Sequence, residues 1–365
     1  MEFSLSGDYL FRGGDIRHDD RVFAEDRERT AQIIATQLER QAGAAADDDG
    51  SGAGRAWRDV RAAALLAAAH EHILPQIWRE ISQRLRQQAF DYIADACRRE
   101  LEQRIDTQAP RSERVAAGDA PRVLVVAGGG FQASSRGALR AVLVDEHGVY
   151  REDFSADSMR SDAPGADALR ELLGRQTVDV VAVAGMAMQT RRLYEDVRTA
   201  VDDHCARTGD DIQVTYASDE TARLWWDSAR AQAELSGLRR EERYCVSVAR
   251  ALQDPAAEYA AMGQDLLHLP LHPRQRDVDQ RALLVVIERA LINVINRVGV
   301  DVNLVARHAH KHPVLQYVSG LGPRKAHAII GRITAGDRPL ESRSDLVVRR
   351  LCTRTVFVNA ASFLH

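Results

Sequence analysis

The stretch VLQYVSGLGPRKAHAIIGRI, residues 314–333, sets two glycines around one leucine and follows them with a proline and two basic residues. Apolar residues at helical spacing on either side predict two short helices, 314–319 and 323–333, joined by the Gly-Leu-Gly turn. Glycine is the residue that adopts the backbone angles of such a tight turn at little cost. We therefore expect a helical hairpin with its central leucine buried.

The second helix of this hairpin has the features of an anion-binding site. A proline at its first position loses no useful hydrogen bond, and the free N–H groups of the first turn can point at a ligand. The glycines carry no side chain to block a close approach, and the basic pair stands beside the opening. Such a site suits a phosphodiester. The predicted nucleic-acid-binding residues are Ser319, Gly320, Gly322, Arg324, Lys325 and Lys311.

The surroundings of the turn are basic, although the chain as a whole is not. The 365 residues carry a formal net charge of -4, so any nucleic-acid surface has to be a local patch. Residues 302–333 contain no acidic residue, and histidines in this stretch could add charge below neutral pH. The basic residues are Arg307, Lys311, Arg324, Lys325 and Arg332.

This pattern is typical of the helix-hairpin-helix motif, which binds DNA backbone without sequence preference. The alternative is that the hairpin only packs two helices together, with Arg324 and Lys325 as solvated surface. His308, His310 and His312 have a spacing that could gather metal ligands on a strand, but the region has a helical pattern. We therefore expect no metal site and no cofactor.

Residues 121–235 alternate between strand and helix patterns. Runs rich in β-branched residues predict strands, and amphipathic stretches lie between them. The strands are expected at 123–127, 139–145, 178–184 and 212–216, with an early hairpin at 146–148, and helices at 168–173 and 191–204. This alternation indicates an α/β domain.

The remaining segments are mainly helical. Apolar residues recur every four positions from Ile73 to Ile105, which predicts a helix of about 30 residues and about 45 Å. It dominates a connecting region at 57–116. Residues 1–56 have no clear assignment, and 41–54 is expected to be a mobile loop because it is rich in Ala, Asp and Gly. Helical patterns return at 240–365, so the fold class is α/β plus all-α.

The cysteines and the hydropathy of the chain indicate the cellular compartment in which we expect it. The four cysteines are far apart in the sequence, without the spacing of a zinc site or a disulfide framework, which indicates a reducing compartment. No apolar run approaches the roughly 18 residues of a membrane span, so we expect a soluble intracellular protein with no membrane partner. The chain stops within the apolar segment VFVNAASFLH, which suggests a fragment of a longer protein.

Several motifs resemble one known family. VINRVGVDVNLVA, HPVLQYVSGLGPRKAHAII and LESRSDLVVRRL resemble the hairpin region of the eukaryotic transcription elongation factor and histone chaperone family named suppressor of Ty six, to which the bacterial Tex proteins are more distantly related. DETARLWWDSARAQAEL is similar to the segment that links the family's YqgF domain to its hairpin domain. The resemblance covers roughly 57–365. Ser362 stands where the family tends to have glycine.

The resemblance implies an RNase H-like YqgF domain with a mixed sheet at 121–235, flanked by the long helix and by a helix-hairpin-helix domain at 240–365. It implies a nuclear, non-enzymatic scaffold that binds DNA or RNA backbone without sequence preference and supports transcription through chromatin. The partners implied are RNA polymerase II, histones and other elongation factors. The family's acidic tail, OB-fold domain and phosphopeptide-binding domains would lie outside this segment.

An RNase H-type nuclease would need clustered carboxylates at its strand ends to hold two metal ions. VLVVAGGGF carries no acid and VDVVAVAGMAMQ ends without one, while Asp145 falls in a turn and Asp179 at a strand start. Asp219 and Glu220 follow Ser218, a predicted helix cap, and are interpreted as partners of the helix dipole. We expect no catalytic residues. The alternative is a metal-dependent, structure-specific nuclease.

Overall fold

The computed structural model describes residues 20–41, 52–107, 114–116, 119–128, 139–185, 189–336 and 338–365. The chain divides into two compact units. The first comprises Met1–Ala94 and Arg274–Asp279, and the second comprises Asp95–Pro273 and Gln280–His365. Among the described residues, no helix combines the length and the apolar character needed to cross a membrane.

The first unit is helical. It contains α1 (Asp20–Gln41), α2 (Gly52–Ala68), the π-helical turn η1 (Ala69–Ile73) and the beginning of α3 (Leu74–Ile105). The predicted long helix is confirmed, since α3 has 32 residues. Ala31 and Ala69 are fully buried where α1 packs on the other helices. The predicted loop at 41–54 is too long, because helix already begins at 52; residues 42–51 lie outside the described residues.

The second unit contains a mixed five-stranded sheet, as the fold prediction required. Its strands are β1 (Val123–Ala127), β2 (Leu139–Val144), β3 (Tyr150–Ala156), β4 (Val180–Ala184) and β5 (Gln213–Ala217). The order is β3-β2-β1-β4-β5; β2 is antiparallel to both of its neighbours, whereas β4 is parallel to β1 and to β5. The sequence patterns assigned no range to β3, because three of its seven side chains are charged and most of the strand is half-buried along an edge of the sheet.

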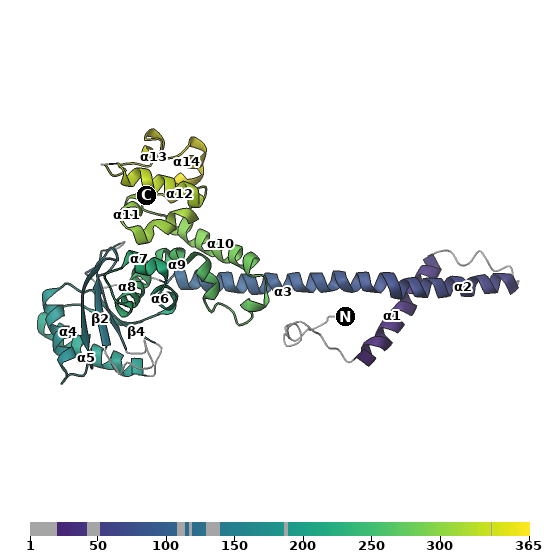
Figure 1. Cartoon of the computed structure of the whole chain (residues 1–365), viewed down its shortest axis with the longest axis horizontal. Coiled ribbons are helices and arrows are strands. Elements are labelled where there is room, and N and C mark those ends of the chain that lie inside the picture. The colour runs from purple at the N-terminus through teal and green to yellow at the C-terminus, as the bar shows by residue number, and fades with distance from the viewer. Residues whose placement is uncertain are drawn as a thin grey trace. The chain divides into compact units, whose positions relative to one another are not determined.

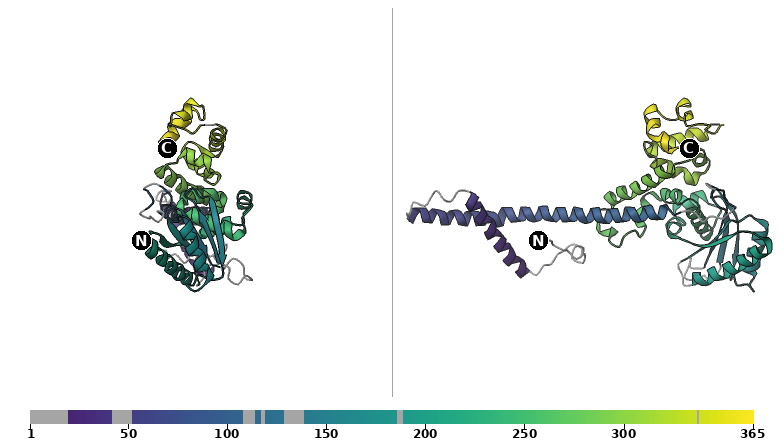
Figure 2. Two further views of the ribbon diagram at one scale, coloured as in Figure 1. Left: turned by 90° about the vertical axis from the view of Figure 1, so that its left-hand side faces the viewer. Right: turned by 180° about the vertical axis from the view of Figure 1, so that it is seen from behind.

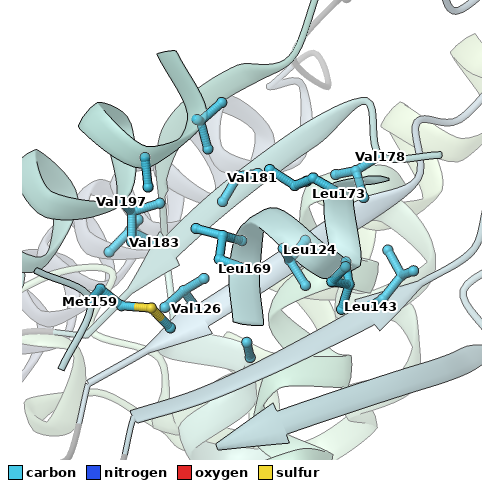
Figure 3. Close-up of a cluster of buried hydrophobic side chains, with 14 of the residues drawn as sticks. Leu124, Val126, Leu143, Met159, Leu169, Leu173, Val178, Val181, Val183 and Val197 are labelled. Atoms are coloured by element: carbon cyan, nitrogen blue, oxygen red, sulfur yellow. The ribbon is translucent and has the colours of Figure 1, made fainter. Parts of the chain in front are cut away.

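Helices cover both faces of this sheet. On one face, α4 (Pro164–Arg175) and α5 (Gln189–Thr208) pack on Leu124, Val126, Val181 and Val183 (Figures 1 and 3). On the other face, α8 (Arg240–Gln253) packs on Val123, Val125 and Val180, with α6 (Glu220–Trp225) beside it. Because successive side chains of β1 and β4 point to opposite faces and both faces are covered, these strands are apolar throughout.

Helices make up the rest of the second unit. They are α7 (Ala229–Glu234), α9 (Pro255–Met262), η2 (Gly263–His268), α10 (Gln280–Val298), α11 (Val302–Arg307), η4 (Ala309–Tyr317), α12 (Gly322–Thr334), α13 (Asp345–Val348), α14 (Arg354–Ala360) and η5 (Ala361–Phe363). The helices after α10 gather in one lobe, coloured light green to yellow (Figure 2).

The first helix of the predicted hairpin differs from expectation. It is the 3-10 helix η4, which begins five residues earlier than predicted, and it contains Pro313. A proline lacks the N–H of a regular α-helical ladder, which disfavours an α-helix here. The second helix, α12, begins at Gly322, one residue before the predicted start.

The sheet core should dominate the stability of the second unit. Leu124 is fully buried on β1, on the sheet face that α4 and α5 cover, so Leu124→Ala should lower the free energy of unfolding by about 2–5 kcal/mol through reduced burial and a residual cavity. Urea unfolding monitored by circular dichroism measures this. Val149→Ala, at a 40% exposed position, is the control and should change it by less than about 0.5 kcal/mol. Equal effects of the two substitutions would contradict this description of the core.

Candidate nucleic-acid interface

The turn between η4 and α12 has the backbone predicted for it. Gly320 and Gly322 have φ angles of 88° and 70°, in the left-handed region that favours glycine. Leu321, between them, is only 4% exposed. The predicted burial of the leucine and the need for glycine on both sides of it are therefore confirmed.

Asn296 on α10 holds this turn in place. Its side-chain oxygen accepts a hydrogen bond from the Ser319 N–H at 2.9 Å, and its amide nitrogen donates to the Tyr317 carbonyl at 3.2 Å. The sequence reasoning missed Asn296. Its signal was a polar residue within the apolar helical run LINVINRV, where a half-buried amide needs hydrogen-bond partners.

The two glycines differ in what lies beside them. A Cβ atom at Gly320 would lie 2.9 Å from the Cβ atom of Asn359, so α14 covers that side of the turn. A Cβ atom at Gly322 would meet nothing within 4 Å. The expectation that a ligand can approach closely at both glycines is therefore corrected. The approach is open at Gly322, whereas at Gly320 the packing of α14 leaves no room for a side chain.

The first turn of α12 presents the basic pair. Arg324 and Lys325 are both exposed, and the Lys325 ammonium donates to the Gly320 carbonyl at 2.8 Å. No side chain in the described part of the chain caps the helix N-terminus, and Pro323 follows the first helical residue, where no intrahelical N–H bond is sacrificed. The free N–H groups and the partial positive charge of a 13-residue helix thus lie beside two cations.

Lys311 does not belong to this group. It lies near the start of η4, where its ammonium pairs with the Asp254 carboxylate at 2.6 Å and is only 12% exposed. The ion pair joins η4 to the junction of α8 and α9. Lys311 therefore does not stand beside the hairpin opening, which the sequence could not reveal because the distance depends on how η4 packs.

The nearby histidines add less charge than expected. Burial lowers the pKa of His310 to about 2, and the neighbouring Arg250 and Lys311 act in the same direction. Burial and His147 also lower the pKa of His308, whose ring stacks on His147 with centroids 4.9 Å apart. These two side chains are neutral packing groups. No group of three potential metal ligands occurs among the described residues.

The carboxylates near the sheet form hydrogen bonds and ion pairs with other side chains of the protein. Asp219 is buried; its carboxylate accepts hydrogen bonds from the Tyr244 hydroxyl and the Arg223 guanidinium, each at 2.7 Å. Glu220 pairs with Arg104 at 2.5 Å and accepts from the Tyr259 hydroxyl. The predicted cap at Ser218 is wrong: Asp219 occupies the cap position, and its side chain turns to Tyr244 and Arg223 instead of the helix N–H groups.

Asp145 and Asp179 lie at the edge where β1 begins. Val123 pairs with both Val144 and Val180, so these acids lie at the opposite end of β1 and β4 from the end where the two strands finish. The Asp145 carboxylate accepts two backbone N–H bonds at 2.9 Å, and Asp179 accepts the Arg122 N–H at 2.8 Å. Neither acid is placed to share a metal ion with Asp219 across the far end of β4.

Comparisons with known proteins agree with this architecture. Residues 117–263 match the family described as Holliday-junction resolvase-like of SPT6, and residues 264–365 match the helix-hairpin-helix motif family. The expected YqgF and helix-hairpin-helix composition is confirmed. The first match continues beyond β5 into the helices that cover the sheet.

Three curated relatives show the extent of the similarity. Transcription elongation factor spt-6 of Neurospora crassa is 33% identical over 291 residues, which are 76% of this chain and 21% of that protein. The spt6 factor of Schizosaccharomyces pombe is 30% identical (81% and 22%), and that of Emericella nidulans 34% identical (79% and 22%). The chain thus spans about a fifth of the length of these relatives.

The two glycines give a paired test of the turn. Gly322→Ala should destabilise the second unit by about 1–2 kcal/mol, the cost of left-handed backbone for a residue with a Cβ atom. Gly320→Ala should cost more, because its Cβ atom also collides with Asn359. Urea unfolding of both variants provides the comparison. A Gly320→Ala variant as stable as Gly322→Ala would show that α14 does not pack on the turn.

Proposed function

Because the chain belongs to the family of Spt6 transcription elongation factors, we propose that it forms a non-enzymatic core of the transcription elongation machinery. In this proposal, the chain binds the backbone of nucleic acids through the turn before α12. The observation that carries the proposal is the open approach to Gly322, next to uncapped N–H groups and two exposed cations. Phosphate oxygens can accept from such N–H groups without contact to any base, so recognition is independent of sequence.

In this proposal the two halves of the second unit have different roles. The sheet and its helices, residues 121–235, form a rigid support, and residues 240–365 carry the contact with DNA or RNA. The relatives' names describe transcription elongation factors, and we extend that role to this chain. It would act in the nucleus with RNA polymerase II, histones and other elongation factors.

A metal-dependent nuclease is the less favoured alternative. Two-metal hydrolysis needs several carboxylates turned toward one point. The lone pairs of Asp219 and Glu220 are instead engaged by tyrosine and arginine side chains. The sequence from Gly128 to Ala138 contains no acid either, so this stretch after β1 cannot supply the missing ligands.

Charge reversal at the turn tests the proposed function. Arg324→Glu with Lys325→Glu should weaken binding of a fluorescent DNA duplex about tenfold or more at low salt. The slope of log K against log salt should fall by roughly 0.9 for each phosphate that the variant no longer neutralises. The matched control is Arg192→Glu with Arg198→Glu, two exposed residues of α5, which should leave affinity and slope nearly unchanged. If the Arg324→Glu, Lys325→Glu variant bound DNA as the parent does, Arg324 and Lys325 would be solvated surface residues with no role in DNA binding.

A cleavage assay separates the scaffold from the nuclease. Branched DNA and RNA–DNA hybrids incubated with Mg²⁺ or Mn²⁺ should remain intact, because the described carboxylates form no metal-ligand cluster. Asp219→Asn keeps an acceptor for Tyr244 and serves to distinguish contaminating activity. Reproducible cleavage that disappears in the Asp219→Asn variant, with its thermal melt preserved, would overturn the non-enzymatic assignment.

A further inference from the structure

A second basic surface follows α12 in the chain. Residues 338–354 contain five arginines and two carboxylates, a net charge of +3. All five arginines are exposed, and the guanidinium groups of four of them make no ion pair or hydrogen bond within the part of the chain that the structure describes. We name this set the second arginine group: Arg338, Arg343, Arg350 and Arg354.

The backbone that carries the second arginine group is fixed by the fifth arginine and by an asparagine. The Arg349 guanidinium donates to the carbonyls of Arg338 and Pro339, at 2.9 and 3.0 Å. Asn303 on α11 binds the Leu340 N–H at 2.8 Å and the Leu340 carbonyl at 2.9 Å. The four cations are therefore presented from an anchored segment, so less conformational entropy is given up when they bind a ligand.

The acids of this segment do not neutralise the second arginine group. Asp345 accepts the N–H groups of Glu341 and Ser342, at 2.9 and 3.2 Å, and these bonds lower the pKa of its carboxyl. Its cationic neighbour is Arg349, at 3.6 Å. One carboxylate is thus used to shape the turn before α13.

The turn at Arg350 is unusual in its backbone. Arg350 has a φ of 55°, the one non-glycine residue with positive φ in the described ranges. Such a conformation is unfavourable for a residue with a Cβ atom and persists where the surroundings impose it. Here the Arg332 guanidinium donates to the Arg350 carbonyl at 2.5 Å, and Leu351 is buried. Glycine would adopt this backbone at a lower cost in free energy than arginine does.

Helix α12 connects the two basic surfaces. Arg324 and Lys325 stand at its first turn, and Arg332, near its last turn, reaches the Arg350 carbonyl. Thirteen residues at a rise of 1.5 Å span about 18–20 Å. Successive phosphates of a DNA strand advance about 3.4 Å along the axis, so this span equals roughly five or six base pairs.

We propose that the second arginine group is a second phosphate-binding surface and that one continuous duplex contacts both ends of α12 at once. The proposal rests on the function proposed for the turn at Gly322 and adds a length requirement to it. When one duplex reaches both surfaces, binding at the first raises the effective concentration of phosphates at the second, and the overall affinity increases. A duplex too short to reach both surfaces gains nothing.

The test measures affinity for two DNA probes by fluorescence anisotropy. One is a loop-closed duplex with a stem of about 16 base pairs, and the other has a stem of about 4, shorter than the span of α12. Arg343→Glu with Arg354→Glu should weaken binding of the long probe about tenfold and leave binding of the short probe within about twofold. Arg324→Glu with Lys325→Glu should weaken binding of both probes.

The Arg350→Gly variant separates the contribution of the Arg350 charge to DNA binding from any effect on stability. Glycine accepts the left-handed backbone of this turn, so the variant should melt at the same or a higher temperature. It should still bind the long probe several-fold more weakly, because one cation no longer faces a phosphate. A variant that is as stable as the parent and binds the long probe equally well would overturn the role of Arg350.

The outcomes distinguish this inference from the function on which it rests. If reversing Arg343 and Arg354 leaves long-probe binding unchanged while the hairpin variant weakens it, the second surface is refuted and the function of the turn stands. If the hairpin variant binds both probes normally, the proposed function itself fails. A poly-glutamate peptide that displaces the long probe as effectively as unlabelled duplex does would indicate an acidic protein partner and would also refute the inference.

Discussion

The left-handed backbone at Gly320 and Gly322 is the constraint on which the binding surface depends. It lets a short turn join η4 to α12 while Leu321 remains buried and Asn296 accepts a hydrogen bond from the Ser319 N–H. Helix α12 can then begin at the surface with its first N–H groups free. A side chain at Gly320 would push the turn away from α14 and loosen the lobe that holds α12.

The carboxylates that follow β5 take part in the packing of helices on the sheet. Its strand order and directions bring β1 and β4 together at the centre, but Asp219 and Glu220 bind tyrosine hydroxyls and arginines. Burial and the bond to Asp219 raise the pKa of Tyr244, which keeps its hydroxyl a donor. These pairs join α6 to α8 and α9, so the acids stabilise the packing of helices on the sheet.

Charge is distributed unevenly over the second unit, and the net charge of the chain hides this. A protein with a formal charge of -4 still presents Arg324, Lys325 and the second arginine group along one helical lobe. Other basic residues are neutralised within the fold, as Lys311 is by Asp254 and Arg250 by Glu234. Exposed, unpaired cations attract polyanions over roughly one Debye length, whereas paired ones contribute mainly to packing.

Local sequence by itself determined the elements that depend on short-range chemistry. The period-four stripe specified α3, the β-branched runs specified β1 and β4, and Gly-Leu-Gly specified the turn, since each follows from side-chain spacing or from permitted backbone angles. The family resemblance added the order of the domains.

Only the tertiary structure decided which residues share a surface. It placed Lys311 against Asp254, covered Gly320 with Asn359, turned Asp219 toward Tyr244 and brought Arg332 to Arg350. These partners are between 18 and 57 residues apart in the chain. Sequence patterns report the spacing within one element, whereas such pairings depend on how elements pack, and packing is set by the complementary shapes of whole helices and strands.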